Sequence, residues 1–271
     1  MDTKLSIWSY YYYELTAEEA VKEFKKHGIY CFELSDEHGL ELLSRGEPKE
    51  VGRRFREYID AEKFTVKQGH LWLSCRLVSD TGALEKLCKW IELYEAVGIE
   101  NAVLHCDPVA QNDNLSNKER LDLNIEKLKQ VQQFTEGMKI RICLENLTRI
   151  VRDADELMYI LSALSPERFG ICLDTGHLNL CGGNQREFIL KAGPRLNALH
   201  IADNEGERDQ HMMPFGKGSV DFEAVVSSLK EIGYSGMFNY EIPGESRAPL
   251  EVKGYKLEYI AKCFEFMMNS Y

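Results

Sequence analysis

The eight residues GICLDTGH (170–177) contain the pattern that decides the fold of this chain. A short apolar run comes first, and two polar side chains, Asp174 and His177, follow it at once. A run of this length suits a strand buried on both faces, as in a parallel sheet. Gly176 lets the chain turn out of the strand. We therefore expect Asp174 and His177 to lie together at its carboxyl end.

Short apolar runs of this kind recur eight times along the chain and alternate with amphipathic stretches. The runs cover residues 4–11, 29–34, 70–75, 102–106, 140–144, 170–173, 197–201 and 237–240. The first amphipathic stretch opens with TAEE (16–19), a capping box typical of a helix start. Strands and helices in alternation indicate right-handed βαβ units and a parallel sheet.

Eight such units in 271 residues predict an α/β protein, a single (β/α)8 TIM barrel that spans residues 1–271 as one domain. A doubly wound open sheet is the alternative. It usually has fewer strands, and its glycine-rich phosphate loop does not follow the first run of this chain.

Charge and cysteine content narrow the class of protein. The formal net charge of −11 disfavours a broad nucleic-acid-binding face, which would need clustered positive charge. The eight cysteines are scattered without a Cys-x-x-Cys pair, so we expect a reducing cytoplasm rather than a disulfide framework. The amino end lacks a secretory apolar region and no stretch is long enough for a bilayer, so we expect no membrane association.

Polar residues lie at the ends of the last five runs or directly after them. They are His105, Glu145, Asp174 with His177, His200, and Glu241. In a barrel, the carboxyl ends of the strands meet at one mouth, where active sites lie. Carboxylates carried there by apolar strands are costly unless they are paired or bound to metal. Mixed carboxylate and imidazole ligands suit one divalent metal ion, such as Mn, Co, Mg, Zn or Fe.

Five short motifs carry a family resemblance. They are LEN (144–146), DTGH (174–177), HIADN (200–204), PFGKGSVDF (214–222), which comes shortly after Asp-Gln-His (209–211), and YEIPG (240–244). In this order they resemble the sugar phosphate isomerase/epimerase family. That family is part of the xylose isomerase-like TIM barrel superfamily, which also includes apurinic-site endonucleases.

The resemblance implies a metal site and a catalytic pair. Glu145, Asp174, His200 and Glu241 would bind the metal ion, and Glu145 and Glu241 would also act as acid and base. One glutamate would remove the proton beside the carbonyl of a sugar or polyol-derived ketone through an enediolate, and the other would return it. The expected activity is a metal-dependent sugar isomerase or epimerase. Barrels of this type often pair, so a homo-oligomer fits as well.

Further residues are expected to bind the substrate. Those that the resemblance or their place at the mouth suggests are His105, His177, Arg208 and His211. The aromatic block WSYYYYE (8–14) adds Trp8, because sugar pockets favour aromatic rings with a polar tip. Glu33 ends the second run, where it either binds hydroxyl groups or pairs with a loop cation.

Two other activities use the same barrel. An inosose-type dehydratase needs the same proton abstraction and differs in what leaves. An apurinic-site endonuclease uses three zinc ions, for which Asp209 and His211 would be additional ligands. That branch has a histidine at the end of its third strand, where this chain offers Ser74 or Cys75, with His70 expected at the opposite end. We therefore expect the sugar enzyme. A non-catalytic sugar-binding barrel is disfavoured because both glutamates are present.

Overall fold

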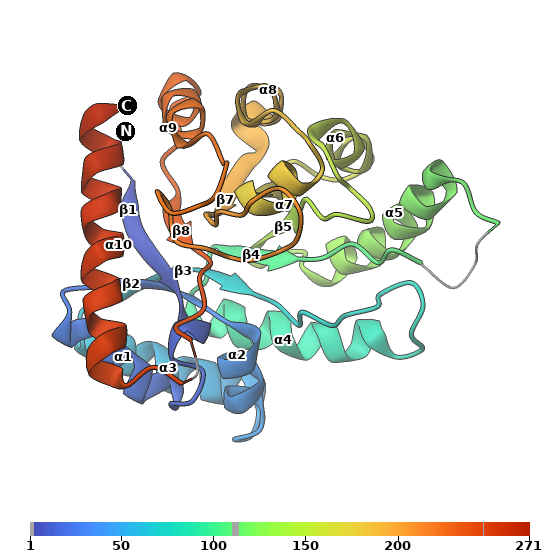
Figure 1. Ribbon diagram of the computed structural model, residues 1–271. Helices are drawn as coiled ribbons and strands as arrows, with labels where there is room; N and C mark the ends of the chain where they lie inside the picture. The colour runs from blue at the N-terminus through green and yellow to red at the C-terminus, as the bar shows by residue number, and fades with distance from the viewer. Residues whose placement is uncertain (1–2, 110–113, 246) are drawn as a thin grey trace.

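The computed structural model describes residues 3–109, 114–245 and 247–271 and confirms the (β/α)8 TIM barrel (Figure 1). Its strands are β1 (Lys4–Trp8), β2 (Cys31–Leu34), β3 (Thr65–His70), β4 (Asn101–Leu104), β5 (Arg141–Glu145), β6 (Phe169–Asp174), β7 (Leu196–His200) and β8 (Met237–Tyr240). They form one parallel sheet in the order β7-β6-β5-β4-β3-β2-β1-β8. A parallel bridge between Ile201 and Tyr240 joins the two outer strands and completes the ring.

The helices lie around the outside of this ring (Figure 1). They are α1 (Ala17–Lys26), α2 (Asp36–Leu43), α3 (Pro48–Ala61), α4 (Ala83–Val97), α5 (Asn117–Phe134), α6 (Ala154–Ser162), α7 (Thr175–Leu180), α8 (Gln185–Ala192), α9 (Phe222–Glu231) and α10 (Leu250–Ser270), with 3-10 turns η1 (Ser9–Tyr12) and η2 (Gly193–Arg195). The capping box expected before α1 is present, with Thr16 and Glu19 each bonding the other's backbone N–H. In the described part of the chain, no helix is long and apolar enough to cross a membrane.

The third strand lies five residues earlier than the apolar pattern indicates. It covers Thr65–His70 instead of residues 70–75. Its polar residue Gln68 is buried inside the barrel, where its Nε2 donates a hydrogen bond to the carbonyl of Leu199 at 3.1 Å. The apolar side chains that follow the strand, Leu71 among them, pack in the outer core instead. His70 therefore lies at the carboxyl end of β3, and the expectation that it faces the opposite end is wrong.

The tight contact between α3 and α4 depends on Gly52. A methyl group on Gly52 would come within 2.6 Å of the Leu93 carbonyl and 2.7 Å of the Ala96 Cβ. We expect Gly52→Ala to lower the free energy of unfolding by about 1–3 kcal/mol, because the helices would have to move apart. Urea denaturation would measure this. Arg53→Ala, at the next and exposed position, should change it by less than about 0.5 kcal/mol, and an equal loss in both variants would contradict the packing argument.

Candidate metal centre and active site

Alternate side chains along each strand point into the barrel, and this alternation determines which residues form the candidate site. Val103, Cys143, Cys172 and Ala198 form a separate, fully buried cluster inside the barrel. Successive inward-facing residues on a strand are two positions apart. The next inward positions toward the carboxyl ends of these four segments are His105, Glu145, Asp174 and His200. The same step from the interior residues Ser6, Gln68 and Asn239 leads to Trp8, His70 and Glu241. The layer at the carboxyl ends is therefore mainly polar. The layer below it is apolar on β4 to β7 and polar on β1, β3 and β8.

Four of these side chains could hold one metal ion. Glu145, Asp174, His200 and Glu241 are buried, and each offers a ligand atom within 4.8 Å of the others. His200 Nδ1 lies 3.3 Å from an oxygen of Glu145 and 3.3 Å from an oxygen of Glu241. Asp174 Oδ2, His200 Nδ1 and Glu241 Oε2 are buried without a hydrogen-bond partner among the described residues. Each buried polar atom without a partner lowers the stability of the fold by about 1–3 kcal/mol. A divalent cation bound by all of these groups would provide the missing partner, so the donor set fits such an ion.

Glu33 orients the histidine of this group. His200 Nε2 lies 3.0 Å from Glu33 Oε1, which leaves Nδ1 directed at the two glutamates. The other oxygen of Glu33 accepts a hydrogen bond from Asn239, whose own oxygen accepts one from Ser6 at 2.8 Å. Glu33 is fully buried in this network. Its partners in this structure are a candidate ligand and an amide, and the expectation that it binds substrate hydroxyls or a loop cation stays a prediction.

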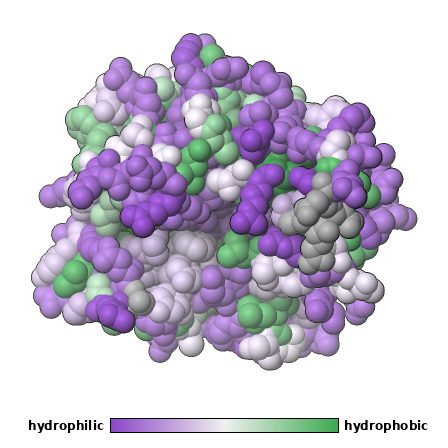
Figure 2. Space-filling view, turned by 45° about the vertical axis from the view of Figure 1, so that its right-hand side comes forward, coloured by the Kyte–Doolittle hydropathy of each residue, from purple (hydrophilic) through white to green (hydrophobic). Residues whose placement is uncertain are grey.

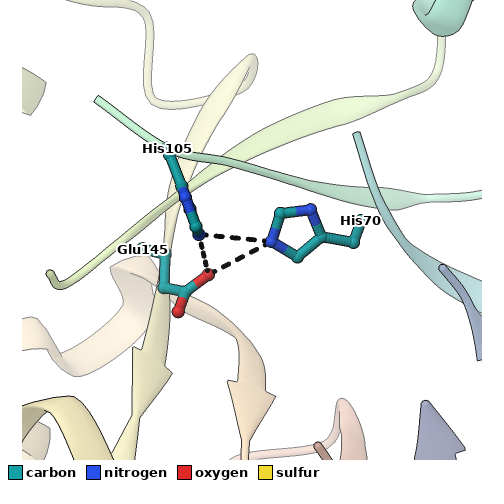
Figure 3. A group of neighbouring side chains, drawn as sticks. All are labelled: His70, His105 and Glu145. Atoms are coloured by element: carbon teal, nitrogen blue, oxygen red, sulfur yellow. Dashed lines mark hydrogen bonds and ion pairs between the residues drawn. The ribbon is translucent and has the colours of Figure 1, made fainter. Parts of the chain in front are cut away.

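A second group lies beside the first, on β3, the end of β4 and β5 (Figure 3). His105 Nε2 lies 3.0 Å and His70 Nε2 3.5 Å from the same oxygen of Glu145. His70 Nδ1 lies 2.7 Å from the carbonyl of Leu71. Donation of the Nδ1 proton to that carbonyl leaves Nε2 free to bind a metal ion. His70 is thus a candidate ligand that the sequence pattern missed.

A third group comes from α7, directly after β6, and from the loop after β7. His177 Nε2 and His211 Nε2 each lie 3.2 Å from an oxygen of Asp209. The other ring nitrogen of each histidine faces a backbone carbonyl, that of Asn146 at 3.0 Å and that of Glu241 at 2.8 Å. The same arrangement as at His70 therefore holds both rings with Nε2 toward Asp209. Asp209 is 44% exposed, so this group is the most open of the three.

The three groups are contiguous. Glu145 belongs to the first two, and its Oε1 lies 3.1 Å from His177 Nδ1 in the third. His211 Nδ1 lies 3.5 Å from Glu241 Oε2. The three groups therefore form one continuous set of donors at the carboxyl ends of the strands. Figure 2 shows a face of the molecule whose surface is hollowed near its centre.

Comparison with known proteins shows the family of this chain. The model of the family described as xylose isomerase-like TIM barrel matches residues 12–263. The chain belongs to this family. A crystal structure of a D-tagatose 3-epimerase-like protein has a TM-score of 0.80 and 22% identity, with 98% of each chain covered, which shows the shared fold.

Relatives with curated names include more than one activity. A D-psicose 3-epimerase of Enterocloster bolteae is 26% identical over 48% of this chain and 42% of its own length. A probable endonuclease 4 of Mycoplasma pneumoniae is 28% identical over 57% of this chain and 58% of its own length. The chain spans about half the length of the curated relatives it matches. Family membership therefore leaves the reaction of this xylose isomerase-like barrel open.

The pKa values of the two glutamates of this xylose isomerase-like barrel shift in opposite directions. Burial raises the pKa of Glu241 to about 8, although His200 and His211 act against this. Burial would also raise the pKa of Glu145, but the charges of His200 and His105 outweigh it and hold that pKa well below its ordinary value. Two carboxyl groups with opposite shifts can act as an acid and a base at the same pH.

The remaining expected substrate contacts are consistent with their positions but stay predictions. His105, His177 and His211 face the centre from three segments. Arg208 is exposed on the loop that carries Asp209. Trp8 is 8% exposed at the end of β1.

Replacement of Glu33 tests the orientation of His200 in this family member. We expect Glu33→Gln to weaken divalent-metal binding by about 10–100-fold, because the ring would lose the carboxylate that fixes its proton on Nε2. Isothermal titration with Mn²⁺ and Co²⁺ would measure the affinity. Glu95→Gln alters a glutamate that accepts backbone N–H bonds far from the mouth, and it should leave the affinity unchanged. Unchanged affinity in Glu33→Gln as well would mean that His200 needs no such support.

Proposed function

We propose that the protein is a divalent-metal-dependent sugar isomerase or epimerase. The convergence of Glu145 and Glu241 carries this proposal. These buried carboxylates come from β5 and from the end of β8, and each places an oxygen 3.3 Å from His200 Nδ1. Proton transfer between two carbons or two faces of a ketose needs two acid-base groups around one reacting centre. The relatives named as sugar epimerases support the same reaction class.

The residues would divide the work as follows. A divalent ion held by Glu145, Asp174, His200 and Glu241 would withdraw electrons from the carbonyl and acidify the neighbouring carbon. One glutamate takes the proton from that carbon, and the other delivers a proton to the neighbouring carbon or the opposite face. His177 and His105 lie within reach of the same space and would hold substrate hydroxyl groups. An inosose-type dehydratase would use the same first step.

Solvent exchange tests the proposal without knowledge of the particular sugar. The metal-loaded protein is incubated in D₂O with D-fructose, D-tagatose, D-psicose and an inosose, and ¹H NMR follows the protons beside the carbonyl. We expect deuterium to enter at least one of these compounds, and a new epimer or aldose would identify the reaction. Loss of water with exchange would indicate the dehydratase. No exchange with any ketone would count against the proposal.

A nuclease is the second candidate, and His70 favours it. The sequence expectation disfavoured this activity because the third strand lacked a histidine at its end. With β3 ending at His70, that objection is removed, and three contiguous donor groups are present. Three zinc ions bound in these groups would suit attack on a phosphodiester.

The number of bound ions would set the charge of the mouth. The donor groups include four carboxylates, those of Glu145, Asp174, Asp209 and Glu241. With neutral histidines, these donor groups alone carry two negative charges with one divalent ion and two positive charges with three. A cluster of three ions would therefore favour a phosphodiester more than a single ion does. Metal analysis of the purified protein, with cleavage of an abasic-site duplex as the paired assay, would separate the two candidates: three ions and efficient cleavage favour the nuclease.

A further inference from the structure

Polar atoms without partners also occur outside the metal centre, on the β1–β2 side of the mouth. Trp8 is more than nine-tenths buried, yet its indole Nε1 has no hydrogen-bond partner among the described residues. Asp36 Oδ1 and Glu37 Oε2, at the start of α2, are buried in the same unpartnered state. One donor and two acceptors near the ends of β1 and β2 are therefore buried without a partner among the described residues.

Aromatic rings connect the metal centre to this place. Trp8 pairs with Glu33 in the register of β1 and β2, so it stands beside the residue that holds His200. Its ring stacks on Tyr10 at 4.5 Å between centroids, and Tyr10 stacks on Tyr13 at 4.9 Å. We call these three rings the aromatic ladder.

The ladder is held against the start of α2. Ser9 lies between Trp8 and Tyr10 in the sequence. Its Oγ is 2.8 Å from His38 Nδ1 and accepts a hydrogen bond from the backbone N–H of Ser35 at 2.9 Å. The nearby carboxylate of Glu37 contributes to the raised pKa of Tyr10, after the effect of burial. Ser9 thus joins the ladder to the start of α2, where Asp36 and Glu37 lie.

A cavity of about 520 Å³ lies between α2, α4 and the segment after β3. Asp36 borders it, as do Trp72, Ser74 and Trp90, and the ammonium group of Lys86 stands over the Trp72 ring. Asp36 Oδ2 accepts a hydrogen bond from the Leu73 backbone at 3.2 Å, which ties the two sides of the cavity together. The cavity thus combines indole walls with a carboxylate edge.

Aromatic faces next to carboxylates recognise a sugar ring. The C–H face of the ring packs on an aromatic face, and its hydroxyl groups donate to carboxylates and accept from an indole N–H. We propose that the aromatic ladder, Asp36, Glu37 and the adjoining cavity form a second subsite that binds a glycosyl ring attached to the ketose. The preferred substrate is then a glycosylated ketose, and a free ketose binds more weakly. This inference rests on the proposed function for the ketose end alone.

Intrinsic fluorescence can report on this subsite directly. The chain has three tryptophans, and all of them, Trp8, Trp72 and Trp90, belong to the ladder or the cavity. The probes are D-fructose and isomaltulose, which carries a glucosyl ring on the same ketose. With the metal-loaded protein we expect isomaltulose to bind at least tenfold more tightly. The double variant Asp36→Asn, Glu37→Gln should lose this preference and keep its affinity for fructose.

A second variant on α2 serves as the control for the double variant. Glu41→Gln, on the same helix but paired with Arg45 on its outer side, should keep the preference. Equal affinity for the two sugars, a preference that persists in the double variant, or no fluorescence change with either sugar would each overturn the subsite. Deuterium exchange separates this from the proposed function: exchange without a glycosyl preference refutes the subsite alone, whereas a glycosyl preference without exchange supports the subsite and refutes the isomerase.

Discussion

Glu241→Gln is expected to reduce deuterium exchange into the responsive ketone by about 10²–10⁴-fold. Glutamine has the size of glutamate but cannot take or deliver a proton at the carbon beside the carbonyl. It also removes one of the buried carboxylates that surround His200 Nδ1. Glu145→Gln should have an effect of the same order, since the reaction needs both partners. NMR rates measured at saturating substrate in D₂O would give the loss for each variant.

Loss of metal must be separated from loss of the acid-base group. Both variants are therefore compared at metal concentrations that saturate them, as shown by titration. Glu126→Gln changes an exposed glutamate on α5 and should retain the full rate. Normal exchange in both Glu145→Gln and Glu241→Gln, with metal bound, would exclude the two-glutamate mechanism.

The order of elements could be predicted because the barrel repeats one simple pattern. Most of the apolar runs coincide with strands to within two or three residues, as for residues 170–173 and β6. Residues that follow these runs, such as Glu145 and Asp174, then reach the mouth by the period of two along a strand. The candidate metal group could be read from the sequence for this reason.

The third strand shows where this reasoning fails. Residues 65–70, TVKQGH, do not form an apolar run, whereas residues 71–75, LWLSC, do. Gln68 can occupy the barrel interior because it finds a carbonyl on β7, 131 positions away, and a long-range partner of this kind leaves no local signal. One local signal was present: position 70 is a histidine, the residue type that already pointed to the mouth at His105 and His200.

The role of Glu33 could not be predicted from the sequence either. Its partner His200 is 167 positions away, and only the closed barrel brings them together. The same holds for the carbonyl partners of His177 and His211, which decide which ring nitrogen faces the centre. Residue type and spacing predict which side chains gather, whereas their tautomers and supporting hydrogen bonds depend on the folded geometry.

Removal of divalent metal is expected to lower the melting temperature. A ligand that binds only the folded state contributes about 2.7 kcal/mol at a hundredfold excess over its Kd, which is roughly 5–11 °C for a chain of this size. The protein treated with a chelator and then dialysed should therefore melt at a lower temperature, and added Mn²⁺ or Co²⁺ should restore it. Unchanged melting in both states would exclude a metal site.

His70→Asn turns this measurement into a count of ions. If one ion is held by Glu145, Asp174, His200 and Glu241, as we expect for the sugar enzyme, the variant should keep the same stoichiometry and the same rise in melting temperature. If the His70–His105–Glu145 group also holds an ion, the number of ions per chain from elemental analysis should fall by one. The rise in melting temperature on addition of metal should then be smaller than in the unchanged protein. His27→Gln changes a histidine on the outside of the barrel, paired with Glu258, and should alter neither quantity. Because His70 takes part in only one of the donor groups, its replacement separates a single-ion centre from a cluster while Asp174, His200 and Glu241 remain in place.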